Sequence, residues 1–358
     1  RESIRLGAAV VEEQLMKKVL TASTIVCGAI IVIMVLFIYG RDHLGPLEMM
    51  MKQEVQAGDT DTEKIAKVYL GIPLPDGISE EDVSVENDYM EQSIVVNVQN
   101  ASVDFYDGKV LDGSSQHIQS VYFDTEANAV QIHIVLDELC EYSTRFYGQK
   151  LQLTFIPVHE MYDKVMIVDV GHGGTSTGNV SYGISEKDVV LAVAKKLKLL
   201  LDQTDIRVYY TRLSDTDVSQ EDRIRLAELS GADLYLSLHV NADANSHVMT
   251  GITTYYNDGT DDHDLTGQVL GTEIQKAVIA STNASDQGAA DHAGEIKLLQ
   301  SIKDPASMLE IGYLTNRQEA LLLASAPYQE KVAEGIYNGI VKAYKKSGKT
   351  INQVTENE

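Results

Sequence analysis

The stretch Lys164–Gly174, KVMIVDVGHGG, decides the fold. It starts as a continuous apolar run, the pattern of a strand buried on both faces, and ends in a glycine-rich turn that carries His172. The following segment, Asp188–Gln203, repeats apolar residues at the spacing of one helical face. A buried strand followed by an amphipathic helix indicates a domain built on a parallel sheet.

The same alternation of strands and helices continues toward the C-terminus. Further strand patterns occur at 206–211, 233–240, 251–256, near 296–301 and at 306–312. Helical patterns occur at 219–231, at about 262–281 and after Asn316, and the segment 286–294 is expected to be a loop. We therefore predict an α/β domain with a mostly parallel sheet flanked by helices over 164–346, and a tail over 347–358.

The residues before this domain have a different pattern. Runs of β-branched and aromatic residues alternate with Asn, Gly, Asp and Ser at Ser93–Val98, His117–Asp124, Ala129–Asp137 and Lys150–Val158. They predict a β-rich, sandwich-like domain over 61–158, preceded by a linker over 41–60. Because the other cysteine, Cys27, lies in an apolar N-terminal segment, we expect Cys140 to be a free thiol.

That apolar segment, Val19–Gly40, carries no charged side chain and follows the pair Lys17 and Lys18. At about 1.5 Å rise per residue, a helix of this length spans the hydrocarbon core of a bilayer. We predict a single-pass anchor over 19–40 with a cytoplasmic tail over 1–18, so that the remaining residues face the outside of the cell membrane. A cleaved signal peptide is the alternative, but the preceding tail is long and no A-x-A pattern follows.

The composition excludes some classes of protein. Asp and Glu number 53 against 29 Lys and Arg, which gives a formal net charge of -24. Nucleic-acid binding requires a basic face and is therefore not expected. Two cysteines exclude a scaffold held by several disulfides and a zinc cluster built on cysteine.

Three side chains fall at one predicted edge of the sheet. His172 and His239 each follow or end a strand, and Glu186 opens the helix after the first strand. Because sites form at the carboxyl ends of strands in open α/β sheets, these side chains are expected to converge. Two histidines and one carboxylate are the ligand set of a hydrolytic zinc site with an open fourth position. We predict one zinc ion per chain.

Glu310 is the candidate catalytic group. It lies at the end of the apolar run 307–310, where an unpaired buried carboxylate is costly without a role. A general base beside a zinc-activated water is such a role. The simpler interpretations remain open: Glu186 as a carboxylate at a helix N-terminus and Glu310 as a core acid in an ion pair. Asp169 could orient a ligand imidazole or be a structural acid.

Five blocks of the sequence support the predicted zinc site. VMIVDVGHGG, ISEKDVVLAVAKKLKLLL, YYTRLSDTDVSQEDRIRLAELSGADLYLSLHVNA, GITTYY and ASMLEIGYLTNRQEALLL resemble, in order, the zinc-dependent N-acetylmuramoyl-L-alanine amidases of bacterial cell walls. The resemblance covers about 164–345 and implies that His172, Glu186 and His239 bind zinc and that Glu310 is catalytic. It departs from the family at four positions that are not ligands: Val170, Ser176, Glu228 and Gln300.

The resemblance implies a peptidoglycan hydrolase that cleaves the amide bond between the lactyl group of N-acetylmuramic acid and L-alanine. Residues 92–158 more faintly resemble the AMIN domain, which is thought to localise such amidases at the wall. A zinc carboxypeptidase acting on stem peptides and a catalytically inactive wall-binding module are the alternatives. A protein activator is left open.

Overall fold

The computed structural model describes residues 69–109, 111–114, 117–126, 128–257, 264–291 and 295–354. The predicted tail, anchor and linker over 1–60 lie outside the described residues. A search of the described helices finds none with the length and apolar character needed to cross a membrane.

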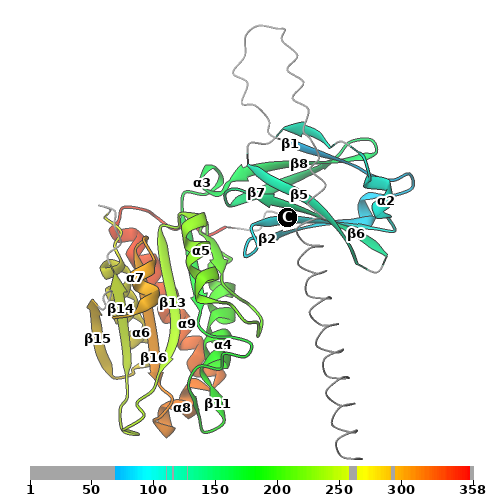
Figure 1. Ribbon diagram of the computed structural model, residues 1–358. Coiled ribbons are helices and arrows are strands. Elements are labelled where there is room, and N and C mark those ends of the chain that lie inside the picture. Colours follow the sequence, from blue (N-terminus) through cyan, green and yellow to red (C-terminus); the bar gives the residue numbers. More distant parts are fainter. Residues whose placement is uncertain are drawn as a thin grey trace, which may run out of the picture.

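The C-terminal half contains a six-stranded sheet in the order β12-β9-β13-β16-β14-β15 (Figure 1). The strands are β9 (Val165–Val170), β12 (Arg207–Tyr210), β13 (Leu234–Asn241), β14 (Ile252–Asn257), β15 (Asp286–Asp291) and β16 (Ala306–Tyr313). All neighbours in the sheet are parallel except β14 and β16, which are antiparallel. The structure thus confirms an α/β domain with a mostly parallel sheet.

Helices cover both faces of this sheet, as its continuous apolar strands require. One face packs against the long helices α4 (Glu186–Leu201), α6 (Gly267–Thr282) and α9 (Ala326–Lys346), and the short helix α8 (Arg317–Leu323). The other face packs against α5 (Gln220–Ser230) and α7 (Lys297–Ser301). Along β9, Met166 and Val168 belong to the first core, whereas Val165 and Ile167 belong to the second.

Two predictions about secondary structure in this domain are wrong. The segment near 296–301, expected to be a strand, is helix α7, whose Leu298 and Leu299 are buried. The segment expected to be a loop contains β15, which has few of the residues that favour strands and is held by pairing with β14. Helix α5 is bounded as the sequence indicates, by Ser219 at its N-cap and Gly231 in the left-handed conformation at its end.

The β-rich part consists of two four-stranded antiparallel sheets that enclose one apolar core. One sheet has the order β4-β1-β8-β7 and contains β1 (Tyr69–Pro73), β4 (Asp112–Ser114), β7 (Cys140–Phe146) and β8 (Lys150–Pro157). The other has the order β2-β3-β6-β5 and contains β2 (Val83–Asp88), β3 (Ser93–Gln99), β5 (Ile118–Glu126) and β6 (Ala129–Leu136). The short elements are η1 (Glu80–Asp82), α2 (Val103–Tyr106), α3 (Val158–Met161), β10 (Val180–Ser181) and β11 (Ile184–Ser185).

The two parts of the chain contact each other along β12, an edge strand of the large sheet. The Tyr89 hydroxyl donates to the Tyr210 carbonyl at 2.8 Å and accepts a longer bond, 3.4 Å, from the Tyr210 amide. Glu141 accepts a hydrogen bond from Tyr209 at 2.7 Å and forms an ion pair with Arg207 at 2.6 Å. The β-rich part therefore binds both the backbone and the side chains of this edge strand.

Candidate metal centre

The three predicted ligands lie together at the carboxyl end of the sheet. Their ligand atoms all lie within 4.8 Å of one another. Glu186 Oε1 is 2.9 Å from Nδ1 of His239 and 3.4 Å from Nε2 of His172. The turn after β9 supplies His172, the first residue of α4 supplies Glu186, and β13 supplies His239. The structure therefore brings together residues that are far apart in the sequence, as the strand-end argument expects.

The glycines around this centre allow its ligands to approach the backbone closely. A Cβ on Gly171 would lie 2.6 Å from Cε1 of His239, and a Cβ on Gly178 would lie 2.6 Å from Oε2 of Glu186. His172 itself has a φ of 58°, in the left-handed region that non-glycine residues seldom adopt. The glycine-rich sequence thus makes room for the ligands, and the backbone at His172 must be held in place by its surroundings.

Glu186 is fixed by donors on both of its oxygens. Oε1 accepts from the amide of Val240 at 2.9 Å, and Oε2 accepts from the amide and the side chain of Asn179 at 2.8 and 2.9 Å. Burial alone would raise the pKa of Glu186, but hydrogen bonds from His172 and His239 lower it well below its usual range. Asn179 is not recognisable from the sequence, because it lies in a loop without a distinguishing pattern.

The charges of the centre favour a cation. Burial would lower the pKa of His239, but the hydrogen bond to Glu186 and the charge of Glu310 outweigh burial, so that the pKa is raised. The centre therefore combines an ionised carboxylate with an imidazole that tends to bind a proton. A metal cation would supply the same positive charge and replace that proton.

Glu310 stands next to this centre on the neighbouring strand. It is the register partner of His239, and β16 continues past it to Tyr313 rather than ending there. Among the described residues, Oε2 of Glu310 is buried without a hydrogen-bond partner. Burial, assisted by the charge of Glu186 and opposed by that of His239, raises the pKa of Glu310 to about 7. A buried carboxylate oxygen without a hydrogen-bond partner is available to face a ligand or a reactant.

Asp169 does not orient an imidazole through any hydrogen bond that the structure shows. It accepts from Ser237 Oγ at 2.6 Å and from Thr211 Oγ1 at 2.9 Å, and it forms an ion pair with Arg223. Burial opposes ionisation, but Arg223 and the Ser237 hydroxyl hold the pKa of Asp169 below its usual range. Of the two interpretations, the buried structural acid agrees with these contacts.

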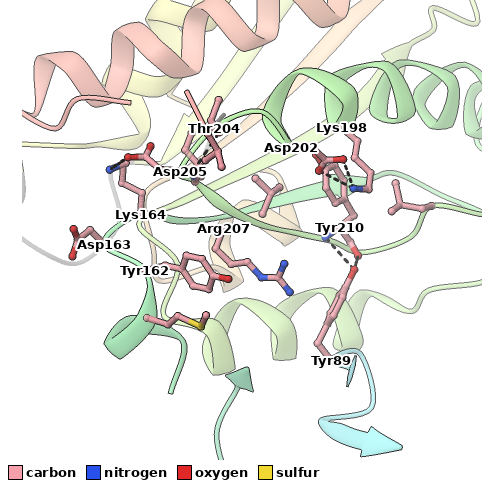
Figure 2. A pocket seen from close by; sticks show the side chains of 15 residues that line it. Tyr89, Tyr162, Asp163, Lys164, Lys198, Asp202, Thr204, Asp205, Arg207 and Tyr210 are labelled. Carbon is pink, nitrogen blue, oxygen red and sulfur yellow. Dashed lines mark hydrogen bonds and ion pairs between the residues drawn. The ribbon is translucent and has the colours of Figure 1, made fainter. Parts of the chain in front are cut away.

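Two other places in the described residues differ from this centre. A cavity of about 640 Å³ lies at the junction of the two parts, beside Tyr162, Lys164, Arg207 and Tyr210 (Figure 2). None of the four predicted site residues lines this cavity, and its lysines pair with neighbouring acids. In the β-rich part, His117, Asp137 and Glu138 also lie close together, but both acids are exposed. In neither place does a buried carboxylate oxygen without a partner lie beside a set of possible ligands.

Comparisons with known proteins identify the family of the C-terminal half of the chain. A family model described as N-acetylmuramoyl-L-alanine amidase matches residues 166–342. The germination-specific N-acetylmuramoyl-L-alanine amidase of Bacillus subtilis (strain 168) is 31% identical over 199 residues, which cover 52% of this chain and 81% of the relative. The endolysin of Bacillus phage SPP1 is 35% identical over 192 residues, which cover 52% of this chain and 69% of the relative.

Among solved structures, an N-acetylmuramoyl-L-alanine amidase from Clostridium difficile 630 is 34% identical, with a TM-score of 0.47, and the match covers 51% of this chain and 97% of that one. The range matched by the family model, 166–342, includes the turn after β9, the start of α4 and the strands that carry His239 and Glu310. The chain belongs to the N-acetylmuramoyl-L-alanine amidase family of bacterial cell-wall enzymes.

Proposed function

We propose that this protein hydrolyses the amide bond between the lactyl group of N-acetylmuramic acid and L-alanine in peptidoglycan, with one zinc ion per chain. The observation that carries the proposal is the joint placement of His172, Glu186 and His239, with Glu310 on the neighbouring strand. Within the described part of the chain, Oε2 of Glu310 is buried without a hydrogen-bond partner. Two histidines and a carboxylate are the donor set of zinc sites that keep a fourth position open for catalysis. The residues present therefore fit zinc.

The chain's own residues divide the chemistry between them. His172, Glu186 and His239 would hold the metal, and Asn179 keeps Glu186 oriented. When bound, zinc supplies Lewis acidity and lowers the pKa of the attacking water to about 7. Glu310 accepts the proton of that water and transfers a proton to the amino group of the leaving L-alanine. A carboxyl group whose pKa is about 7 can accept and release a proton near neutral pH.

The decisive experiment is mass spectrometry of purified peptidoglycan digested with the full chain. Free stem peptides that begin with an intact L-alanine amino terminus are expected. Shortened peptides still attached to the glycan would instead support the carboxypeptidase, and no release would support the inactive module. Chelation should abolish the release and zinc should restore it. Release that persists in a protein shown to be free of metal would contradict the zinc mechanism.

We also propose that the protein works outside the cell membrane, attached by the anchor over 19–40. The support is the apolar sequence of that segment and the lysine pair before it. The net charge of -24 argues against retention by anionic wall polymers, so retention is assigned to the anchor and to the AMIN-like β-rich part. Protease added to intact cells should degrade the C-terminal parts. Complete protection of these parts would contradict this orientation.

A further inference from the structure

Two buried arginines bind three consecutive carbonyl groups of the turn that carries His172. Arg212 donates to the carbonyl of Val170 at 3.0 Å and to that of Gly171 at 2.8 Å. Arg223 donates to the carbonyl of Val170 at 2.9 Å and to that of His172 at 2.9 Å. Both side chains are nearly inaccessible, at 4% and 6% exposure. Two planar guanidinium groups therefore hold the backbone carbonyl groups of this turn.

The same two arginines connect this turn to the elements that carry the other two ligands. Arg212 also donates to the carbonyl of Lys187, the residue after Glu186, at 3.0 Å. Arg223 pairs with Asp169, and Asp169 accepts from Ser237 on β13, two residues before His239. Each proposed ligand is therefore at most two residues from a hydrogen-bonded group in this network. The arginines bind two of these groups directly and bind the third through Asp169.

This arrangement is costly and needs a compensating role. Burying a guanidinium group is unfavourable unless its donors are satisfied. Burial lowers the pKa of Arg212, and the nearby charge of Arg223 lowers it further. One acid, Asp169, forms an ion pair with Arg223, whereas the Arg212 bonds to the turn and to Lys187 all go to carbonyl groups. The turn they bind holds His172 at a positive φ. Two neighbouring buried cations would be a poor solution for the core alone.

We propose that Arg212 and Arg223 are positioning residues for the metal centre. They fix His172 in its left-handed conformation and hold it in position relative to Glu186 and His239. This inference rests on the proposed zinc site. Lysine keeps the charge of arginine but presents a single ammonium group, which cannot bind two carbonyls through the fixed fork of a guanidinium. The proposal therefore predicts that Arg212→Lys and Arg223→Lys each impair the metal centre although the charge is retained.

The chain offers a matched control on the same helix. Arg225 lies two residues from Arg223 on α5, and it donates to the carbonyl of Met90 in the β-rich part rather than to the turn. Arg225→Lys makes the same chemical change without touching the metal centre. It separates a loss specific to the turn from a general effect of replacing an arginine on α5.

The experiment measures zinc affinity by competition with a chelator, and the visible absorption of the cobalt-substituted protein, for the full chain and the three variants. Loss of one of these partners should weaken zinc binding about 10- to 100-fold, the usual effect of removing groups that support a ligand. The cobalt spectrum should also change in Arg212→Lys and Arg223→Lys, and Arg225→Lys should match the unaltered protein. Thermal unfolding of the metal-free proteins shows which variants are folded.

The outcomes separate this inference from the proposed function. If the unaltered chain binds zinc and both turn variants, once folded, bind it within twofold with the same cobalt spectrum, the positioning role is wrong and the zinc site stands. If the unaltered chain binds no zinc, the proposed function fails as well. Should Arg223→Lys fail to fold, Arg212→Lys alone decides, because its ties to the turn do not involve Asp169.

Discussion

His239 and Glu310 are register partners on the adjacent parallel strands β13 and β16. Neighbouring residues in register on a sheet project to the same face, so a proposed zinc ligand and the proposed proton acceptor are fixed side by side by backbone pairing. Both groups therefore lie on strands, which position side chains more precisely than loops do.

Replacing Glu310 should separate catalysis from metal binding. In Glu310→Gln the side chain keeps its size but cannot accept the water's proton, so we expect turnover of purified peptidoglycan to fall by about 100-fold or more. Zinc content should stay at one ion per chain, because Glu310 is not among the ligands. Glu228→Gln, which removes a surface carboxylate paired with Lys303, is the control and should change neither value. Full activity in Glu310→Gln would exclude the assigned role.

The histidine ligands should be required for zinc itself. His172→Ala and His239→Ala each remove one of three protein ligands, and we expect both variants to lose zinc on dialysis, as measured by elemental analysis. His159 provides the comparison, because its Nε2 lies 2.8 Å from the carbonyl of Ser230, away from the metal centre. His159→Ala should keep the metal. One zinc ion per chain in both ligand variants would contradict the assignment.

The buried acid Asp169 should contribute to stability over a defined pH range. Its pKa is lowered on folding, so its ionised form stabilises the fold at pH values above about 4, and the contribution is lost as the pH falls through the lowered value. Asp169→Asn leaves Arg223 buried without its charge partner, which costs about 3–5 kcal/mol.

Urea unfolding from pH 7 down to pH 3 tests this prediction. The difference between Asp169→Asn and the unaltered protein should be constant at neutral pH and should narrow only below about pH 4. Asp202→Asn, at an exposed pair with Lys198, is the control and should cost less than about 1 kcal/mol. A difference that narrows instead near pH 7 would point to another titrating group.

Cys140 should resist alkylation in the folded protein. Its side chain is fully buried, and burial raises the pKa of the thiol to about 12, so almost no reactive thiolate is present at pH 8. Iodoacetamide should leave the Cys140 peptide unmodified under native conditions and modify it in urea, as followed by mass spectrometry. The Cys27 peptide is followed separately. Rapid native labelling of Cys140 would mean that this part of the β-rich core opens readily.

The strand-end logic of α/β sheets made most of the candidate site predictable from the sequence. The candidate ligands lie after a strand (His172), near the end of a strand (His239) and at the start of a helix (Glu186). The sequence pattern that locates these elements is strong because the sheet is buried on both faces. The supporting contacts were not predictable. Arg223 meets Asp169 across 54 positions of sequence, and only the packing of α5 on the sheet brings them together.

The two wrong predictions of secondary structure, at 286–294 and near 296–301, also arise from tertiary packing that the sequence pattern does not show. β15 has the sequence DQGAAD, which has no intrinsic preference for a strand and forms one because β14 offers a free edge. Conversely, the short apolar run around Leu298, predicted to be a strand, packs as a short helix against the sheet. The secondary structure of short segments is set by their tertiary neighbours, whereas that of long periodic segments such as α4 is set by the sequence pattern.

The junction at Tyr89 has a further consequence for solubility. A parallel sheet ends in strands whose outward amide and carbonyl groups can pair with another chain, and such edges promote aggregation unless they are covered or charged. On β15 an aspartate stands at each end of the strand. On β12 the Tyr89 hydroxyl takes the place of a neighbouring strand at Tyr210. The β-rich part thus covers this edge and opposes self-association. An α/β domain expressed without it would expose β12, which could then pair with another copy of the domain.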